Sequence, residues 1–351
     1  MSERVLMKGN EACCHGAIAG GCRYFFGYPI TPQNQIPEYM SLHLPEVGGV
    51  YLQAESEVAA INMVYGAAAT GVRVMTSSSG PGVSLMQEGL SYMIGSELPC
   101  VVVNIVRGGP GLGNIAAAQS DYFLATRGAG HGDGSGLTIA PYSVQEMHDL
   151  TARAFDLAER YRMPVTVLGD AILGQMAEPC RLAPWGEAPQ PDLDWAIGGA
   201  RHGRERRIIN SLYVAPEDLD AHNRLIASRV EQASREVTEW QEYGHDAPDL
   251  LLCAYGICAR VAETVVDWAG EQGLKVRLLR PISLLPFPVE PLRSWAERVQ
   301  QILVVELSLG QFVQDVRLAV EGRCPVHLQA ATGGVLLTPE DVLAEVKSLM
   351  K

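Results

Sequence analysis

Two carboxylates, those of Glu55 and Glu57, precede a stretch that carries no charged residue from position 58 to position 72. Apolar residues recur at helical spacing within this stretch, which predicts a helix over residues 58–69. A carboxylate at the start of a helix can cap its free N–H groups and complement the helix dipole. It can also act inside a buried site as a partner of a ligand. On these residues alone, capping is the simpler interpretation.

A second group of residues, Tyr-Pro-Ile-Thr-Pro at positions 28–32, follows a short predicted strand over residues 23–26. The residue before each proline is disfavoured in helical backbone angles, which predicts an irregular loop at the carboxyl end of that strand. Ligands bind at this edge of open α/β sheets. Thr31 could therefore contact a ligand, or it could be the N-cap of the next helix.

A third candidate is Arg107, which follows a predicted buried strand over residues 98–106 and precedes the glycine-rich segment 108–113. A guanidinium at the end of a strand suits bidentate capture of a carboxylate, although a surface ion pair is an equal alternative. The glycines lack the Gly-x-Gly-x-x-Gly spacing of a phosphate-binding loop. They therefore favour a loop that passes close to substrate over a phosphate site.

The elements that must position these residues alternate between helices and short apolar strands, which predicts a doubly wound parallel α/β sheet in residues 1–177. The remaining elements expected there are helices over residues 7–19 and 143–161 and strands over residues 72–75 and 163–170. A proline-containing linker with a charged bridging helix, residues 219–243, is expected within 178–248. Residues 249–351 read as a smaller α/β domain, with strands at 250–254, 276–279 and 302–306 and helices at 261–268 and 312–320.

Composition excludes several classes of function. The formal net charge of −13 argues against a nucleic-acid partner, which would require a basic face. No run approaches the roughly 20 apolar residues that cross a bilayer, and the N-terminus lacks the features of a secretory signal. The eight cysteines form no four-cysteine cluster motif, so we expect reduced thiols in the cytoplasm and no metal or iron–sulfur site in this chain.

Several of these segments together carry a resemblance to a known family. Tyr28-Pro29-Ile30-Thr31-Pro32, Ser56-Glu57 before the alanine-rich helix, and Ser79-Gly80-Pro81-Gly82 resemble the pyrimidine-binding domain of thiamine diphosphate enzymes. In particular, they resemble the alpha subunit of 2-oxoacid:ferredoxin oxidoreductases. Tyr255-Gly256, Arg280-Pro281 and Glu306-x-x-x-Gly310-Gln311 resemble the second domain of the same family, which is similar to the transketolase C-terminal domain.

The resemblance implies roles for the candidate residues. Glu57 aligns with the carboxylate that bonds the pyrimidine nitrogen and favours the tautomer able to deprotonate the thiazolium ring, whereas Glu55 is displaced by two positions. Thr31 and Arg107 align with residues that bind the substrate's carboxylate. The remaining residues expected to bind the cofactor are Tyr28, Pro29, Ile30, Ser79 and Gly80.

The magnesium half of the cofactor site is expected on another chain. Residues 132–134 read Gly-Asp-Gly, which opens the magnesium motif of thiamine diphosphate enzymes, but the asparagine needed some 25 to 30 residues later is missing. The resemblance therefore implies a beta subunit that binds the diphosphate and Mg²⁺, and gamma- or delta-type subunits that carry [4Fe-4S] clusters. His131 is expected to be a structural loop residue, although it could approach the site.

The implied reaction is oxidative decarboxylation of a 2-oxoacid with coenzyme A, giving an acyl-CoA, CO₂ and reduced ferredoxin. The length of the chain favours 3-methyl-2-oxobutanoate, with 2-oxoglutarate as the alternative. A non-oxidative thiamine diphosphate decarboxylase chain and a non-catalytic assembly subunit remain open. So do the roles of Glu306 and of the basic segment Arg201–Arg207, which is a solvated face, a partner contact or a site for the phosphates of coenzyme A.

Overall fold

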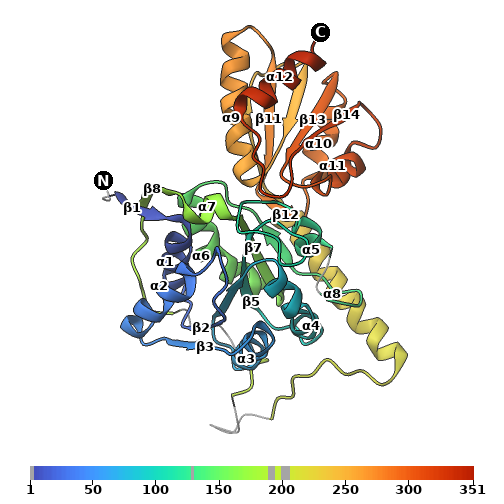
Figure 1. Ribbon diagram of the computed structural model, residues 1–351. Helices are drawn as coiled ribbons and strands as arrows, with labels where there is room; N and C mark the ends of the chain where they lie inside the picture. Colours follow the sequence, from blue (N-terminus) through green and yellow to red (C-terminus); the bar gives the residue numbers. More distant parts are fainter. Residues whose placement is uncertain (1–3, 128–129, 189–193, 199–205) are drawn as a thin grey trace.

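The computed structural model describes residues 4–127, 130–188, 194–198 and 206–351. Two α/β units are stacked one above the other (Figure 1), each built around its own sheet. The larger unit contains a seven-stranded sheet in the order β12-β6-β7-β5-β4-β2-β3. Its strands are β2 (Tyr24–Gly27), β3 (Val50–Gln53), β4 (Val74–Ser78), β5 (Cys100–Val106), β6 (Leu137–Ile139), β7 (Pro164–Asp170) and β12 (Ser283–Leu285). All pairs are parallel except β12 with β6.

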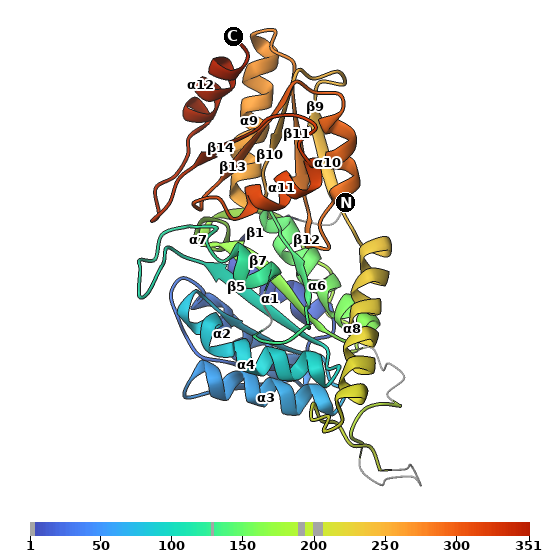
Figure 2. The same cartoon turned by 90° about the vertical axis from the view of Figure 1, so that its right-hand side faces the viewer.

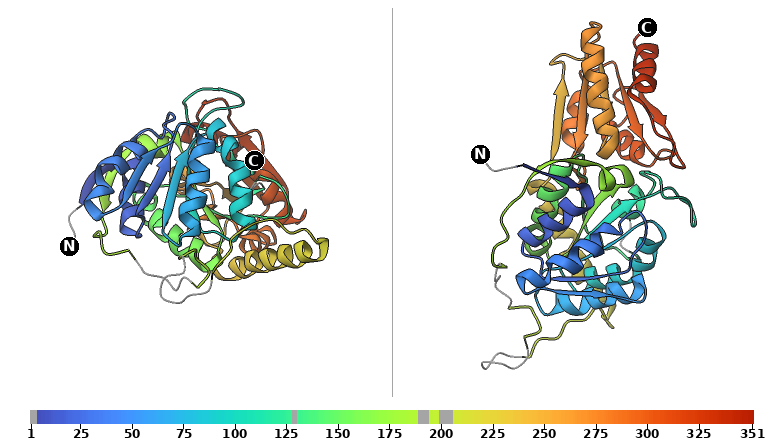
Figure 3. Two further views of the ribbon diagram at one scale, coloured as in Figure 1. Left: turned by 90° about the horizontal axis from the view of Figure 1, so that it is seen from below. Right: turned by 60° about the vertical axis from the view of Figure 1, so that its left-hand side comes forward.

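The sequence of β5 shows why this sheet is buried on both faces. Val101, Val103 and Ile105 belong to the core on one face, while Cys100 and Val102 belong to the core on the other. A strand covered on both sides can be apolar throughout, which is typical of parallel sheets. The first face is covered by α1 (Gly9–Ala19), α2 (Gln35–His43) and α6 (Val144–Tyr161), and the second by α3 (Glu57–Ala69) and α4 (Pro81–Gly95). Figure 3 shows the two layers of helices from below.

The smaller unit has a five-stranded sheet in the order β14-β13-β10-β11-β9. Its strands are β9 (Trp240–Gly244), β10 (Leu250–Cys253), β11 (Val276–Pro281), β13 (Gln301–Glu306) and β14 (Val326–Ala330). Its helices are α9 (Gly256–Glu271) and α12 (Pro339–Leu349) on one face and α10 (Val289–Ala296) and α11 (Phe312–Val320) on the other.

The two units share a hydrophobic core. Val106 and Leu168, near the carboxyl ends of β5 and β7, belong to the same buried cluster as Leu251 and Phe312 of the smaller unit. The smaller unit therefore covers part of the carboxyl edge of the larger sheet. The elements next to this junction are α5 (Tyr122–Thr126), α7 (Ala171–Gln175) and the ribbon formed by β1 (Arg4–Lys8) and β8 (Ala177–Arg181).

The bridging segment contains α8 (Pro216–Glu236), which runs along the side of the larger unit (Figure 2). Tyr161 donates a hydrogen bond to Glu236 at 2.8 Å, which fixes the end of α8 on α6. In the part of the chain that the structure describes, no helix is both long and apolar enough to cross a membrane.

Three expectations about elements need correction. The first helix begins at Gly9, because residues 4–8 form β1 and pair with β8. The bridging helix ends at Glu236 and does not reach residue 243, because the segment from Trp240 to Gly244 pairs with β11 as strand β9. The larger sheet also extends beyond its expected segment, since β12 comes from within the second domain's sequence.

Candidate functional site

The carboxyl ends of β2 and β4 mark the point where the strand order of the larger sheet reverses. From β2 the chain continues to β3 on one side, and from β4 it continues to β5 on the other. The loops after two such strands diverge and leave a crevice, where ligands bind in doubly wound sheets. Residues 28–34 and the turn at Ser79–Gly80 follow these two strands, so both segments begin at the edge of the sheet where the strand order reverses.

Glu57 lies at the first position of α3 and is 6% exposed, whereas Glu55 is exposed. The N-cap is Ser56, whose hydroxyl accepts the N–H of Ala59 at 3.2 Å. Within the described residues, no hydrogen bond or ion pair reaches the carboxylate of Glu57. The side-chain bond that caps the helix is thus made by Ser56 and not by Glu57.

The turn that begins α4 brings a backbone against this carboxylate. A Cβ atom added at Gly82 would lie 2.5 Å from Oε1 of Glu57 and 2.1 Å from Oγ of Ser78. Gly80, with φ of 45°, takes a backbone conformation that side chains disfavour. A Cβ at Gly80 would lie 3.8 Å from Nε of Arg107. The turn therefore has a carboxylate against one glycine and a guanidinium over the other.

Unpartnered polar atoms surround the same turn. The buried hydroxyls of Ser78 and Ser79 and Nε of Arg107 find no hydrogen-bond partner among the described residues. Buried polar groups in native proteins almost always have partners. Together with the unbonded carboxylate of Glu57, these atoms offer donors and acceptors to a polar ligand or to water at the turn.

Arg107 is 7% exposed, so it is not a surface residue, and it makes no ion pair within the described residues. Its Nη1 donates to the carbonyl oxygen of Thr31 at 2.8 Å, and its Nη2 donates to that of Leu112 at 3.2 Å. A guanidinium has five N–H donors, so these two bonds orient the group and leave donors for an anion. Arg107 and Thr31 are thus brought together, as expected for two residues that bind one carboxylate.

The loop that carries Thr31 is held by Gln33, which the sequence did not single out. Gln33 is fully buried; its Nε2 donates to the carbonyl oxygen of Tyr28 at 3.0 Å, and its Oε1 accepts from the hydroxyl of Ser77 at 3.0 Å. Helix α2 begins at Gln35 with Asn34 as its N-cap, so Thr31 is not the N-cap of that helix. No local pattern marks Gln33, because both of its partners are set by the fold.

The other expected residues of the loop differ in exposure. Tyr28 and Pro29 are exposed and Ile30 is half-buried. The carbonyl oxygen of Pro32 accepts bonds from the side chains of Asn10 at 3.0 Å and Gln175 at 2.8 Å. These bonds tie the loop to α1 and α7, so its exposed end projects from a fixed base.

Asp121 is a second residue that the sequence did not identify. Its Oδ2 accepts from Nδ2 of Asn104 at 3.1 Å. Burial raises the pKa of Asp121, while bonds from Asn104 and from the N–H of Gly80, and the charge of Arg107, oppose the rise. Asp121 therefore links the end of β5 to the turn after β4 and orders the two loops that flank the crevice.

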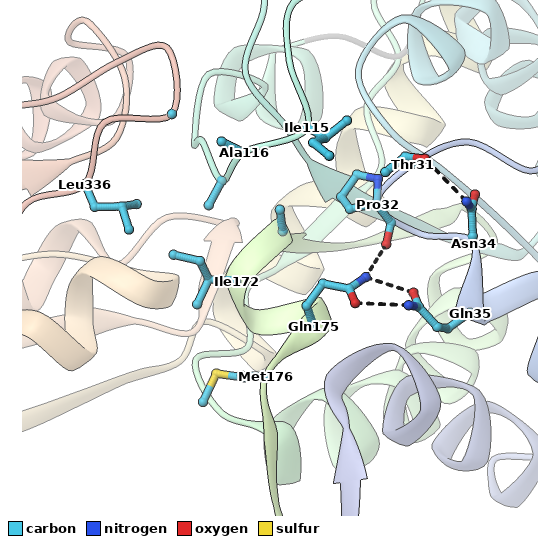
Figure 4. Close-up of a pocket in the computed structure, with 13 residues that line it drawn as sticks. Thr31, Pro32, Asn34, Gln35, Ile115, Ala116, Ile172, Gln175, Met176 and Leu336 are labelled. Atoms are coloured by element: carbon cyan, nitrogen blue, oxygen red, sulfur yellow. Dashed lines mark hydrogen bonds between the residues drawn. The ribbon is translucent and has the colours of Figure 1, made fainter.

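A pocket of about 650 Å³ opens next to Thr31 (Figure 4). It lies between the loop from Ile115 to Ala117, helix α7, and Gly334 and Leu336 of the smaller unit. Its polar side chains include Gln35 and Gln175, which bond to each other at 2.8 and 3.0 Å.

The residues left open by the sequence lie outside this crevice. Glu306 is fully buried and accepts bonds from the hydroxyl of Ser308 and from the N–H groups of Phe312 and Val313, so it caps α11. His131 is exposed, with its carbonyl bonded to Ser91. Of the basic segment, residues 201–205 lie outside the described residues, and Arg206 and Arg207 are exposed. Among the described residues, no three His, Cys, Asp or Glu side chains are grouped to hold a metal.

Comparisons with protein families place both units. A family described as "Pyruvate flavodoxin/ferredoxin oxidoreductase, thiamine diP-bdg" matches residues 15–233. A second, "Pyruvate:ferredoxin oxidoreductase core domain II", matches residues 248–342. The ketoisovalerate oxidoreductase subunit VorB of Methanothermobacter marburgensis is 45% identical over 98% of this chain and 97% of its own length. The 2-oxoglutarate synthase subunit KorA of Methanocaldococcus jannaschii is 37% identical over 96% of this chain and 97% of its own.

Among solved structures, 2-oxoglutarate:ferredoxin oxidoreductase from Magnetococcus marinus, with 2-oxoglutarate, coenzyme A and succinyl-CoA bound, is similar at a TM-score of 0.91 and 28% identity. That match covers this whole chain, which spans 66% of the longer one. A split-gene transketolase shares the fold at a TM-score of 0.61 and 14% identity, over 97% of both chains.

Proposed function

The chain belongs to the pyruvate flavodoxin/ferredoxin oxidoreductase family, and we propose that it is the alpha-type subunit that binds the pyrimidine half of thiamine diphosphate and the substrate's carboxylate. Membership of this family and the two-unit α/β fold confirm the resemblance drawn from the motifs. The relatives named VorB and KorA are subunits of oxidoreductases that act on 2-oxoacids, so a 2-oxoacid is the substrate class.

The observation that carries the proposal is the side chain of Glu57, which is 6% exposed, accepts no hydrogen bond within the described residues and has Oε1 close to Gly82. A carboxylate with so little exposure and no protein partner is costly, and a ligand that supplies a partner would remove that cost. When bound, thiamine diphosphate supplies a carbon nucleophile that allows a 2-oxoacid to lose CO₂. Glu57 would hold the pyrimidine ring through a charge-assisted hydrogen bond.

The other residues of the crevice have complementary tasks. Arg107 presents its remaining N–H donors to the carboxylate of the oxoacid, beside Thr31. Tyr28, Pro29 and Ile30 from one loop and Ser79 and Gly80 from the other would line the cofactor. The buried hydroxyl of Ser79, which finds no partner among the described residues, is the group of this set most in need of a ligand.

The proposal also assigns work to partner chains. We expect a beta subunit to bind the diphosphate and Mg²⁺, gamma- or delta-type subunits to carry [4Fe-4S] clusters, and coenzyme A and ferredoxin to accept the acyl group and the electrons. The support is the absence of the asparagine that should follow Gly-Asp-Gly at 132–134 in a magnesium motif and the naming of the relatives as subunits. All eight cysteines are free thiols, which supports a cytoplasmic location.

The test is Glu57→Gln in the purified complex, with Glu55→Gln as a matched control two positions away on the exposed side. We expect Glu57→Gln to lower 2-oxoacid-dependent reduction of ferredoxin or a substitute dye by at least about 100-fold, the scale of proton-transfer catalysis. Subunit assembly, measured by size-exclusion chromatography, should be unchanged in both variants.

Three results would contradict the proposal. Full turnover in Glu57→Gln would remove Glu57 from the mechanism. Release of CO₂ without reduction of ferredoxin would indicate a non-oxidative decarboxylase. An equal effect of both variants would show that the carboxylates act only through helix stability, as in a non-catalytic assembly subunit.

A further inference from the structure

We propose that the pocket beside Thr31 holds the side chain of the 2-oxoacid, and that its uncharged walls select branched or longer apolar side chains over one that ends in a second carboxylate. The inference rests on the proposed function and specifies its substrate class. It concerns the 650 Å³ pocket between α7, the loop from Ile115 to Ala117 and Leu336 of the smaller unit (Figure 4).

The position of the pocket follows from the shape of the substrate. In a 2-oxoacid the carboxylate and the side chain leave the carbonyl carbon in different directions. If Arg107 and Thr31 hold the carboxylate, the side chain must enter a space that adjoins them. Thr31 lines the pocket and its carbonyl oxygen is bonded to Arg107 at 2.8 Å, so the pocket begins where the carboxylate clamp ends.

The walls of the pocket determine which side chains fit. Apolar atoms come from Ile115, Ile172, Met176 and Leu336, and none of the 13 lining residues carries a charge. Ile115 and Leu336 are partly open to solvent, so a carboxylate placed there would lose part of its water and gain no cation from the lining, which is unfavourable. An alkyl group would lose only its contact with water, which is favourable.

The polar side chains in the pocket do not change this conclusion. Gln35 and Gln175 bond to each other at 2.8 and 3.0 Å, and Gln175 also donates to Pro32 at 2.8 Å. Nδ2 of Asn34 bonds to the hydroxyl of Thr31 at 3.3 Å. These amides are occupied by protein partners, so they are poor replacements for the guanidinium or ammonium group that a second carboxylate would need.

The volume of the pocket favours a substrate whose side chain is larger than a methyl group. Its 650 Å³ falls within the range of roughly 300–1,000 Å³ typical of small-molecule sites, so a single methyl group would leave most of it unfilled. The far wall is fixed by the docking of the two units, because Nδ2 of Asn114 donates to the carbonyl oxygen of Gly333 at 2.8 Å. A Cβ added at Gly334 would lie 2.5 Å from the side chain of Ala116.

The experiment measures kcat/KM of the purified complex for pyruvate, 3-methyl-2-oxobutanoate, 4-methyl-2-oxopentanoate and 2-oxoglutarate. We expect the two branched substrates to exceed pyruvate by at least about tenfold, the discrimination that a methylene group gives in an apolar pocket. We expect 2-oxoglutarate to fall at least about 100-fold below them, because its second carboxylate has no partner.

Two substitutions test the pocket itself. Ile172→Arg and Leu336→Arg each introduce a cation into the lining, one from each unit, so the inference does not depend on the folding of a single variant. Each should lower kcat/KM for the branched substrates and raise it for 2-oxoglutarate, changing their ratio by at least about 100-fold. Leu318→Arg is the matched control for Leu336→Arg, since Leu318 is 65% exposed on α11 and does not line the pocket. It should leave the ratio unchanged.

The outcomes separate this inference from the proposed function. A complex that reduces ferredoxin with 2-oxoglutarate as its best substrate would overturn the inference and leave the proposed function standing. Arginine variants that raise the KM for coenzyme A without changing the ratio of oxoacids would also overturn it, because the pocket would then hold the arm of coenzyme A. Turnover of no 2-oxoacid at all would overturn the proposed function and the inference with it.

Discussion

Substitution of Gly82 by alanine should inactivate the complex without unfolding the chain. Gly82 lies in the first turn of α4, where its backbone is helical and alanine is a better helix former than glycine by roughly 0.5–1 kcal/mol. The new methyl group, however, would lie 2.5 Å from Oε1 of Glu57 and 2.1 Å from Oγ of Ser78. The same change therefore favours the helix and displaces the carboxylate.

The size of the displacement follows from the contacts. An ordinary contact of a Cβ atom begins at 3.4 Å, so Oε1 of Glu57 must move by about 0.9 Å, from 2.5 to 3.4 Å, if the backbone stays in place. A misplacement of about 1 Å in a catalytic constellation can cost about 100-fold in rate, which corresponds to about 2.7 kcal/mol of transition-state stabilisation. We therefore expect kcat of Gly82→Ala to fall by about 100-fold.

The assay is oxoacid-dependent reduction of ferredoxin by the purified complex, with the urea midpoint of the isolated chain measured in parallel. Gly66→Ala is the control, because Gly66 lies in α3 and a Cβ there meets nothing within 4 Å. It should stabilise the chain by up to about 1 kcal/mol and leave turnover unchanged. Wild-type turnover in Gly82→Ala would refute the reasoning, because it would mean that the position of the Glu57 carboxylate does not matter.

Two further predictions follow from buried charges. Arg107→Ala should raise the KM for the oxoacid by roughly 10- to 100-fold, because a hydrogen bond to a charged group contributes about 1.5–3 kcal/mol; an unaltered KM would place the carboxylate site elsewhere. Burial raises the pKa of Asp170 from 3.8 to about 6, against bonds from the N–H groups of Ile172 and Leu173. Between these pH values the folded chain keeps a proton that the unfolded chain releases, so stability should fall by about 3 kcal/mol as pH rises through this window. Asp170→Asn should flatten the dependence of the urea midpoint on pH, and an unchanged slope would contradict the assignment.

The sequence predicted the strands beneath the site better than it predicted the edges of the sheets. β5 and β7 are mostly apolar, and burial on both faces leaves such strands little alternative. The edge strands β12 and β9 are less marked in the sequence. β12 is three residues long and pairs with β6 across more than 140 residues of sequence. β9 mixes polar and aromatic residues without the alternation of a half-buried strand. Short strands of this kind are specified by the partner that pairs with them.

In the candidate site, too, the sequence revealed some residues and not others. Residue type and spacing made Thr31, Glu57 and Arg107 candidates, because a carboxylate in an uncharged stretch and a guanidinium at a strand end are unusual, but only the resemblance to the family gave them roles. Gln33 and Asp121 were missed. Gln33 accepts from Ser77, 44 residues away, and Asp121 accepts from Asn104, 17 residues away, so each side chain resembles any polar loop residue until the loops are folded together.

The arrangement of Glu57 and Arg107 argues that the crevice exists for ligands. The two opposite charges lie against neighbouring glycines of one turn, at Gly82 and Gly80, yet within the described residues no ion pair joins them to each other or to any other group. Arg107 lies close enough to Asp121 for its charge to oppose the rise in the pKa of that carboxyl, but the bonds that its guanidinium makes within the described residues go to backbone carbonyl oxygens. Kept apart, the carboxylate is free for a nitrogen base and the guanidinium for an acid, so the turn separates the two halves of the proposed chemistry while holding both within one crevice.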